Sequence, residues 1–197
     1  MGLTIGKETL QLGAHLGGGI VVYIDASGKH GLIAADRYDP ISPWNADTTY
    51  LWDSGTDWDH FVNDTDICTS TVLLVPPETI TLIRGGSYAT SLTVWSTGLG
   101  NTNVINSYTS ATHIFTANAL CLNYNGGGYT DWYLPSKDEL NKLYIAHTFG
   151  IGGFVASLYW SSSEYSATNA WYQDFNNGGQ GYNYKATNYY VRAVRSF

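Results

Sequence analysis

Residues 159–197 decide the fold, and they read YWSSSEYSATNAWYQDFNNGGQGYNYKATNYYVRAVRSF. This C-terminal segment holds seven of the chain's 16 tyrosines but only five charged residues. Tyrosine offers a large, stiff contact surface with a hydroxyl at its tip, while Ser, Asn and Gly offer small, adaptable hydrogen-bonding groups. The composition favours a binding surface over a catalytic pocket. The alternative is a tyrosine-rich hairpin that only covers a core, because aromatic residues are also ordinary strand formers.

The middle of this segment has the two-residue period of a β-strand. Residues 170–175 predict a short strand on which Trp171 and Phe175 enter the core and Tyr172 and Asp174 point outward. Large apolar side chains and polar side chains thus alternate between two faces. We therefore expect the outward face to carry the residues that contact a ligand.

Further strands follow from turn residues and apolar runs. Residues 176–179 (NNGG) predict a chain reversal, because Asn and Gly accept positive φ at low cost. Residues 181–185 and 189–196 are the returning strands that this reversal implies. Near the other end of the chain, residues 18–24 and 31–35 flank the turn DASGKH and predict a second hairpin.

Two helices are expected between the hairpins. Apolar residues at helical spacing predict one helix over residues 101–122, although Thr and Asn lower its propensity. Ser136 and Glu139 form a capping-box pattern that starts a second helix, which residues 150–153 end. Residues 36–100 show no sustained period and predict long ordered loops with short strands.

Length and charge limit the class of protein. A chain of 197 residues fits a single domain, here residues 18–197 after a lead-in segment of residues 1–17, with the expected binding region at 159–197. Only nine Lys and Arg, a net charge of -7 and no basic run argue against nucleic acid or an anionic membrane surface as partners. No apolar run approaches the ~20 residues of a membrane helix, and no signal peptide is visible.

Metal and thiol chemistry have few candidates. The acidic stretch from Asp53 to Asp66 could supply oxygen ligands for calcium, but its spacing matches no EF-hand loop, and a solvated acidic loop is the simpler interpretation. The five histidines are scattered and show no zinc-site spacing. We therefore expect no cofactor, with calcium as the alternative. Cys68 and Cys121 could pair or remain two buried thiols, and the second is the simpler interpretation.

No catalytic constellation can be assembled from the sequence. Residues 98–100 (GLG) precede a helix start that could accept an anion, although a plain turn and cap is the simpler interpretation. Asp131, Glu139 and Glu164 are isolated carboxylates with no partner that the sequence identifies. Without a nucleophile, base and orienting group, we expect that the protein is not an enzyme.

Several segments together resemble the bacterial and phage domain family found at the C-terminus of the Legionella collagen-like adhesin. The resemblance spans nearly the whole chain from Gly18, except residues 36–100. The segments that carry it are GGIVVYID (18–25), GKHGLIAA (28–35), NT (101–102) with the helix it opens, DWYLPS (131–136), YWSSSEY (159–165), AW (170–171), FNNG (175–178) and VRAVR (191–195).

The C-terminal segment also resembles the variable region of proteins diversified by a diversity-generating retroelement, in which template adenines are copied as any base. Asn codons then become Tyr, Ser, Thr, Asp or Gly, whereas the codons of Trp171 and Phe175 need contain no adenine. The residues of the variable type are the candidate ligand-binding set: Ser166, Thr168, Asn169, Tyr172, Asp174, Gly181, Tyr182, Asn183, Tyr184, Thr187 and Asn188.

The resemblance implies an α+β fold of the C-type-lectin-like type, formylglycine-generating-enzyme subtype. We expect small twisted antiparallel sheets, two helices, long loops and paired N- and C-terminal strands. The implied function is a receptor- or ligand-binding module of a phage tail fibre or bacterial surface. Its partner would be a protein or glycan on a target cell, without membrane insertion and with self-association as an option.

Two other functions are compatible with the resemblance. An adhesin for acidic polysaccharide would need a basic patch, for which Lys185, Arg192 and Arg195 are the candidates. An enzyme of the formylglycine-generating type would need active-site cysteines, and neither Cys68 nor Cys121 lies in a matching stretch. Calcium-dependent sugar recognition is not expected, because the Glu-Pro-Asn and Gln-Pro-Asp motifs of sugar-binding lectins are absent.

Overall fold

The computed structural model describes most of the chain outside the predicted loop region. The described residues are 10–36, 49–51, 71–73, 79–81, 98–107, 116–166 and 168–197. The acidic stretch from Asp53 to Asp66 and most of the loop region predicted over residues 36–100 lie outside them.

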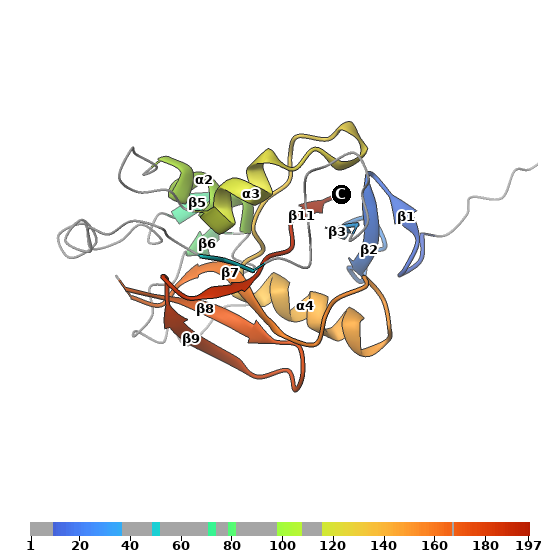
Figure 1. The fold of residues 1–197 in the computed structure, drawn as a ribbon. Coiled ribbons are helices and arrows are strands. Elements are labelled where there is room, and N and C mark those ends of the chain that lie inside the picture. The colour runs from blue at the N-terminus through green and yellow to red at the C-terminus, as the bar shows by residue number, and fades with distance from the viewer. Residues whose placement is uncertain are drawn as a thin grey trace, which may run out of the picture.

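The N-terminal hairpin is present and joins the C-terminus in one antiparallel sheet (Figure 1). Its strands, in spatial order, are β1 (His15–Leu16), β2 (Gly19–Ile24), β3 (Gly31–Ala35) and β11 (Val194–Ser196). Every residue of β3 is buried, as expected of an apolar run covered on both faces. The pairing of β3 with β11 confirms that the N- and C-terminal strands meet.

A second, five-stranded sheet carries the C-terminal segment. Its strands, in spatial order, are β4 (Thr49–Leu51), β10 (Asn188–Tyr190), β7 (Leu158–Glu164), β8 (Asn169–Asp174) and β9 (Gln180–Tyr184). β10 runs parallel to β7, whereas the other pairs are antiparallel, so this sheet is mixed. A separate two-stranded ribbon joins β5 (Thr71–Leu73) to β6 (Thr79–Thr81).

The predicted strand at residues 189–196 is wrong as a single element. β10 and β11 belong to different sheets, and the chain crosses between them at residues 191–193, all of which are buried. Arg192 stabilises the crossing. Its Nη1 donates to the carbonyls of Ala35 (2.9 Å) and Gly152 (3.0 Å), so the buried guanidinium joins the end of β3 to the segment that follows α4.

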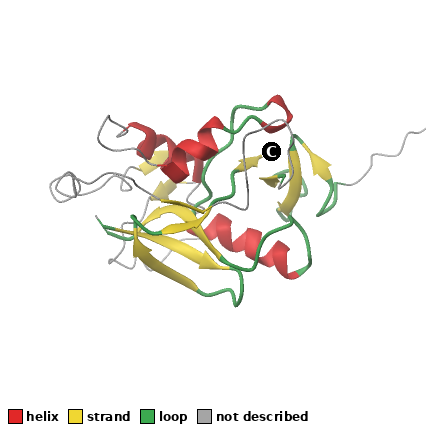
Figure 2. Ribbon diagram, viewed as in Figure 1, coloured by secondary structure: helices red, strands yellow, loops and turns green. Residues whose placement is uncertain are grey.

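The helices cover the sheets (Figure 2). They are α2 (Gly98–Ser107), α3 (Thr116–Asn123), the short 3₁₀ turn η1 (Gly126–Gly128) and α4 (Lys137–Thr148). The single helix predicted over 101–122 is found as two elements, α2 and α3, and residues 108–115 between them lie outside the described residues. The predicted capping box is confirmed, with Ser136 as N-cap and Glu139 bonding back to it.

Two buried clusters hold these layers together. α4 lies between the two sheets and packs its apolar side on β2, β7 and β8 (Figure 1). That cluster contains Leu140, Leu143, Tyr159 and Phe175. The other cluster joins α2 and α3 to the opposite faces of both sheets, around Trp132, Trp160 and other apolar residues. The five-stranded sheet is thus packed on both faces near its centre, and its open part is toward β9.

Candidate functional site

Three aromatic rings form a cluster where β7 ends and β8 and β9 run side by side. The rings of Tyr165 and Tyr182 are stacked, with centroids 3.5 Å apart and planes 4° from parallel. Trp171 stands edge-on to both, at 5.4 Å from Tyr165 and 5.7 Å from Tyr182. Trp171 and Tyr182 are cross-strand partners, which places them on the same face of the sheet. Tyr165, Trp171 and Tyr182 are called the aromatic cluster below.

Helix α4 supplies a cation to this cluster. The ammonium of Lys137 lies 3.7 Å from the centroid of the Trp171 ring, a cation–π contact. Burial lowers the pKa of Lys137, because an ammonium loses hydration there. Gln180 of β9 donates to the Lys137 carbonyl (2.9 Å) and ties the hairpin to the helix start. The cluster therefore combines aromatic area, an amine and an amide in one place.

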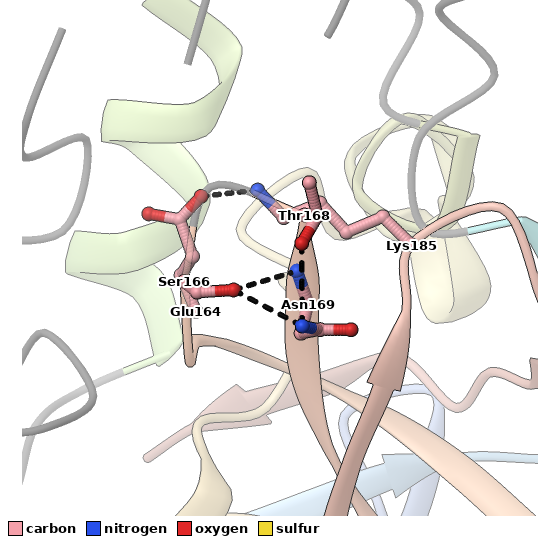
Figure 3. Close-up of polar contacts among 5 residues, drawn as sticks. All are labelled: Glu164, Ser166, Thr168, Asn169 and Lys185. Carbon is pink, nitrogen blue, oxygen red and sulfur yellow. Dashed lines mark hydrogen bonds and ion pairs between the residues drawn. The ribbon is translucent and has the colours of Figure 1, made fainter. Parts of the chain in front are cut away.

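Small polar side chains border the cluster where β8 begins (Figure 3). The backbone N–H and side-chain amide of Asn169 both donate to Ser166 Oγ (3.2 Å each), and the same amide donates to Thr168 Oγ1 (3.2 Å). These bonds order the turn between β7 and β8. A ligand at this end of the sheet would meet hydroxyl and amide groups that are already fixed in position.

A buried ion pair lies beside this turn (Figure 3). The Lys185 ammonium contacts the Glu164 carboxylate, and the side chains are 0% and 7% exposed. The expectation that Glu164 is isolated is therefore wrong. Glu164 pairs with Ala170, which pairs with Asn183, so the sheet register brings residues 164 and 185 together. The pair is a structural element of the hairpin.

The opposite face of the hairpin is more closely packed. Tyr172 lies half-buried against the edges of Trp160 (6.5 Å) and Tyr189 (5.2 Å). Asn183 of the neighbouring strand donates to the Tyr189 hydroxyl (2.7 Å). Phe175 is buried in the core as predicted. Trp171 and Tyr172 are both half-buried, Trp171 under Lys137 and Tyr172 against a core cluster, so the inward position predicted for Trp171 and the outward position predicted for Tyr172 need correction. Both faces of this sheet are covered in part, so a strict alternation of core and solvent does not hold.

The predicted ligand-binding residues are divided between two faces and two turns. None of the eleven is fully buried. On the face of the aromatic cluster lie Asn169, Tyr182 and Tyr184. On the opposite face lie Tyr172, Asp174, Gly181 and Asn183. In the turns at the end of the sheet, or beginning the following strand, lie Ser166, Thr168, Thr187 and Asn188.

Three residues of the aromatic face were missed from the sequence. Tyr165 directly precedes Ser166, the first residue of the candidate set. Because it is a tyrosine like Tyr182, its residue type could have included it among the candidate binding residues. Trp171 was assigned to the core. Lys137 belongs to a different element, and nothing in the sequence indicates that the start of α4 lies over β8.

The other carboxylates have structural partners. Glu139 Oε2 accepts from the N–H groups of Gly98 (2.7 Å) and Ser136 (2.8 Å), while Tyr133 donates to its Oε1 (3.1 Å). The start of α2, considered as an anion site, thus holds a carboxyl group of the same chain. Burial raises the pKa of Glu139 from its ordinary value of 4.5 to about 7.

Asp131 is paired as well, which corrects its description as isolated. It accepts two bonds from Arg195, at 2.8 Å and 2.9 Å, and this pairing lowers the pKa of Asp131. The partners are 64 residues apart, and they meet because Tyr133 forms a β-bridge with Val194 beside β11.

Other predicted chemistry falls partly outside the described residues. Within them, no three His, Cys, Asp or Glu side chains gather to hold a metal, and the acidic stretch considered for calcium is not described. Cys121 is a free, buried thiol whose pKa burial raises, and Cys68 lies outside the described residues. No helix in the described part of the chain has the length and apolar character needed to cross a bilayer.

These features define an α+β domain of two curled sheets with an exposed aromatic hairpin. The chain belongs to the Lcl C-terminal domain family, whose model matches residues 47–195. A fimbrial protein from Bacteroides ovatus has a similar fold, with a TM-score of 0.51 and 15% sequence identity. The match covers 89% of this chain and 43% of that protein, so this chain spans less than half of its length. No curated protein matches.

Proposed function

We propose that this domain is an adhesin-like ligand-binding module that grips a protein or glycan on a target cell surface. Membership in the Lcl C-terminal domain family and the fold shared with a fimbrial protein support a role at a surface. The binding surface, called the grip below, would consist of the aromatic cluster, Tyr184 and the polar turn of Ser166, Thr168 and Asn169. Display on a bacterial surface or a phage tail fibre fits such a module, and no enzymatic activity is part of the proposal.

The observation that carries the proposal is the exposure of two tyrosines on an ordered strand. Tyr182 is 49% exposed and Tyr184 is 64% exposed. The strand that bears them is held by the Lys185–Glu164 pair and by the Gln180 bond to α4. Rigid aromatic groups on an ordered frame lose little entropy on binding, which is why such residues dominate binding energy at interfaces.

The charges of the segment favour a ligand without strong negative charge. Lys185 and Arg192 are fully buried, and Arg195 is paired with Asp131. The basic patch that an acidic polysaccharide would require is therefore not formed by these three residues. Lys137, half-buried over Trp171, is the cation that belongs to the aromatic face. A protein or an uncharged glycan suits this surface better.

Two finer parts of the proposal concern fold type and diversification. The paired N- and C-terminal strands, the second sheet and the helices between them support a C-type-lectin-like scaffold. The partial exposure of all eleven candidate residues supports a surface varied by a diversity-generating retroelement. The DNA downstream of the gene tests this second part. A near-copy of the sequence encoding residues 159–197, differing only at adenines and beside a reverse transcriptase gene, is the expected finding.

Cell binding by matched variants tests the main proposal. The labelled domain is added to a panel of bacterial and animal cells, and bound fluorescence is measured for wild type, Tyr182→Ser/Tyr184→Ser and Phe149→Ser. Phe149 is 74% exposed beyond the end of α4 and serves as the control. We expect the double variant to lose binding and the control to keep it, with both melting temperatures close to wild type.

Pretreatment of the cells identifies the receptor type. Loss of binding after protease indicates a protein receptor, and loss after periodate indicates a glycan. If the double variant binds as well as wild type, the aromatic face is not the grip. If it unfolds, the tyrosines are structural.

A further inference from the structure

The last strand of the five-stranded sheet has an open edge. β9 is terminal in the strand order and pairs only with β8 among the described residues (Figure 1). Lys185 N–H donates to the Thr168 carbonyl and Asp174 N–H to the Gly179 carbonyl, which fixes the hydrogen-bond alternation at both ends of this ladder. In an antiparallel pair, every second residue directs its backbone groups at the partner and the others direct theirs away.

Three residues of β9 direct their backbone groups away from β8. By this alternation they are Gln180, Tyr182 and Tyr184. The Tyr184 N–H is occupied by its own neighbour, because Asn183 Oδ1 accepts from it at 2.8 Å. The Tyr184 carbonyl is occupied as well, because it accepts from the Thr187 N–H at 2.9 Å. The N–H and carbonyl groups of Gln180 and Tyr182 face the open edge. Unpaired backbone groups in a row are a template for another strand.

The open edge also lacks the protection that isolated edge strands usually carry. Residues 176–184 (NNGGQGYNY) contain no Lys, no other charged residue and no Pro. Charged residues and prolines are the common means of preventing one edge from pairing with another. The chain as a whole carries a net charge of -7, so a second copy is repelled over much of the surface. The uncharged edge is a place where a copy can approach without that repulsion.

We propose that β9 pairs with β9 of a second copy of this chain, in an antiparallel arrangement about a two-fold axis at Gly181. Gln180 of each copy then exchanges both of its backbone hydrogen bonds with Tyr182 of the other copy. The two Tyr182 side chains become diagonal neighbours on one face, because such an axis keeps the same face of both sheets on the same side. The two aromatic clusters join into one continuous surface.

This inference deepens the proposed function, since it places two grips side by side. Two linked sites raise the apparent affinity for a surface that carries many receptors. A five-residue edge is small compared with the ~800 Å² per partner of a standard interface, so the dimer is expected to be weak in dilute solution. Local crowding of many copies on one surface would favour it.

Sedimentation velocity of the full chain tests the dimer, across a concentration range from roughly 10 µM to roughly 1 mM. Wild type should shift from monomer toward dimer. Gln180→Pro removes a backbone N–H that points away from β8, so the hydrogen bonds between β8 and β9 are kept. Because both copies carry the substitution, the dimer loses two hydrogen bonds. We expect the dissociation constant to rise about ten- to a hundredfold. Gln180→Ala, which keeps the N–H and loses the side chain, is the matched control and should stay close to wild type.

One further variant keeps the test decisive if proline disturbs folding. Tyr182→Lys places like charges at diagonal positions across the axis and should weaken the dimer. A wild type that remains monomeric throughout overturns the proposal, and so does a dimer that Gln180→Pro and Tyr182→Lys leave unchanged. Cell binding by a strictly monomeric wild type would overturn the dimer and leave the proposed function standing.

Discussion

Glu139→Gln should remove a pH dependence of folding that the wild-type chain carries. The Glu139 carboxyl joins the starts of α2 and α4 by accepting from Gly98 and Ser136 at one oxygen. Its other oxygen contacts the Tyr133 hydroxyl. Glutamine reproduces this arrangement, because its carbonyl oxygen can accept both backbone bonds while its amide donates to the tyrosine oxygen. The substitution therefore changes the charge and keeps the shape.

The magnitude follows from the pKa of Glu139, raised by burial from 4.5 to about 7. A raised carboxyl pKa means that folding takes up a proton between these two pH values. The contribution to stability is fully present below pH 4.5 and is lost as the pH rises through 7. At about 1.4 kcal/mol for each pH unit, wild type should lose about 3 kcal/mol relative to the glutamine variant across this window.

Urea unfolding of both proteins at several pH values between roughly 4 and 8 measures this difference. Every other titrating group is common to the two proteins, so the difference between their unfolding free energies isolates Glu139. We expect the difference between the two unfolding free energies to change in favour of Glu139→Gln as the pH rises. If the difference in unfolding free energy does not change with pH, the folded protein stabilises the charged and the neutral form of Glu139 equally well. The two backbone donors would then compensate the carboxylate for its lost hydration.

Three more substitutions test other parts of the frame by thermal or urea unfolding. Lys185→Met leaves the buried Glu164 carboxylate without its ammonium partner and should lower the unfolding free energy by about 3 to 5 kcal/mol. The double variant with Glu164→Gln should recover most of this loss, and no recovery would contradict the pairing. Tyr172→Ala should cost about 2 kcal/mol and Tyr184→Ala less than about 0.5 kcal/mol, and equal costs would refute the difference in packing. Gly18→Ala should cost roughly 2 kcal/mol or more, because φ is 82° and the added Cβ would lie 2.2 Å from the Gly126 carbonyl oxygen; a neutral effect would show that this approach relaxes.

Local features of the fold were predictable because local chemistry determines them. The capping box at Ser136 and Glu139 and the fully buried strand over residues 31–35 follow from adjacent residues. The reversal after β8 follows from Asn and Gly, and Gly178 has a φ of 82°. Such signals act within a few residues and do not depend on the rest of the chain.

Features that depend on the sheet register were not predictable from one sequence. Glu164 finds Lys185 only because β7, β8 and β9 align in one order. Trp171 was expected in the core, since nothing indicated that Lys137 would lie over its ring. The alternation of residues 170–175 is present, but both faces of this sheet carry packed layers, so periodicity alone could not tell the core face from the binding face.

The charges of the C-terminal segment explain how a fixed frame and the proposed binding surface can lie in one short stretch. Arg192 is buried on Phe154 and bonds to carbonyls of other segments, and the Lys185–Glu164 pair lies under the hairpin. Removing either buried cation would leave partners without compensation, so these positions are fixed by folding. Tyr184 and the polar turns contribute area that the core does not need. Substitutions at those exposed positions can therefore change the proposed binding surface while the unfolding free energy stays nearly constant, which is what a surface varied on an unchanged scaffold would require.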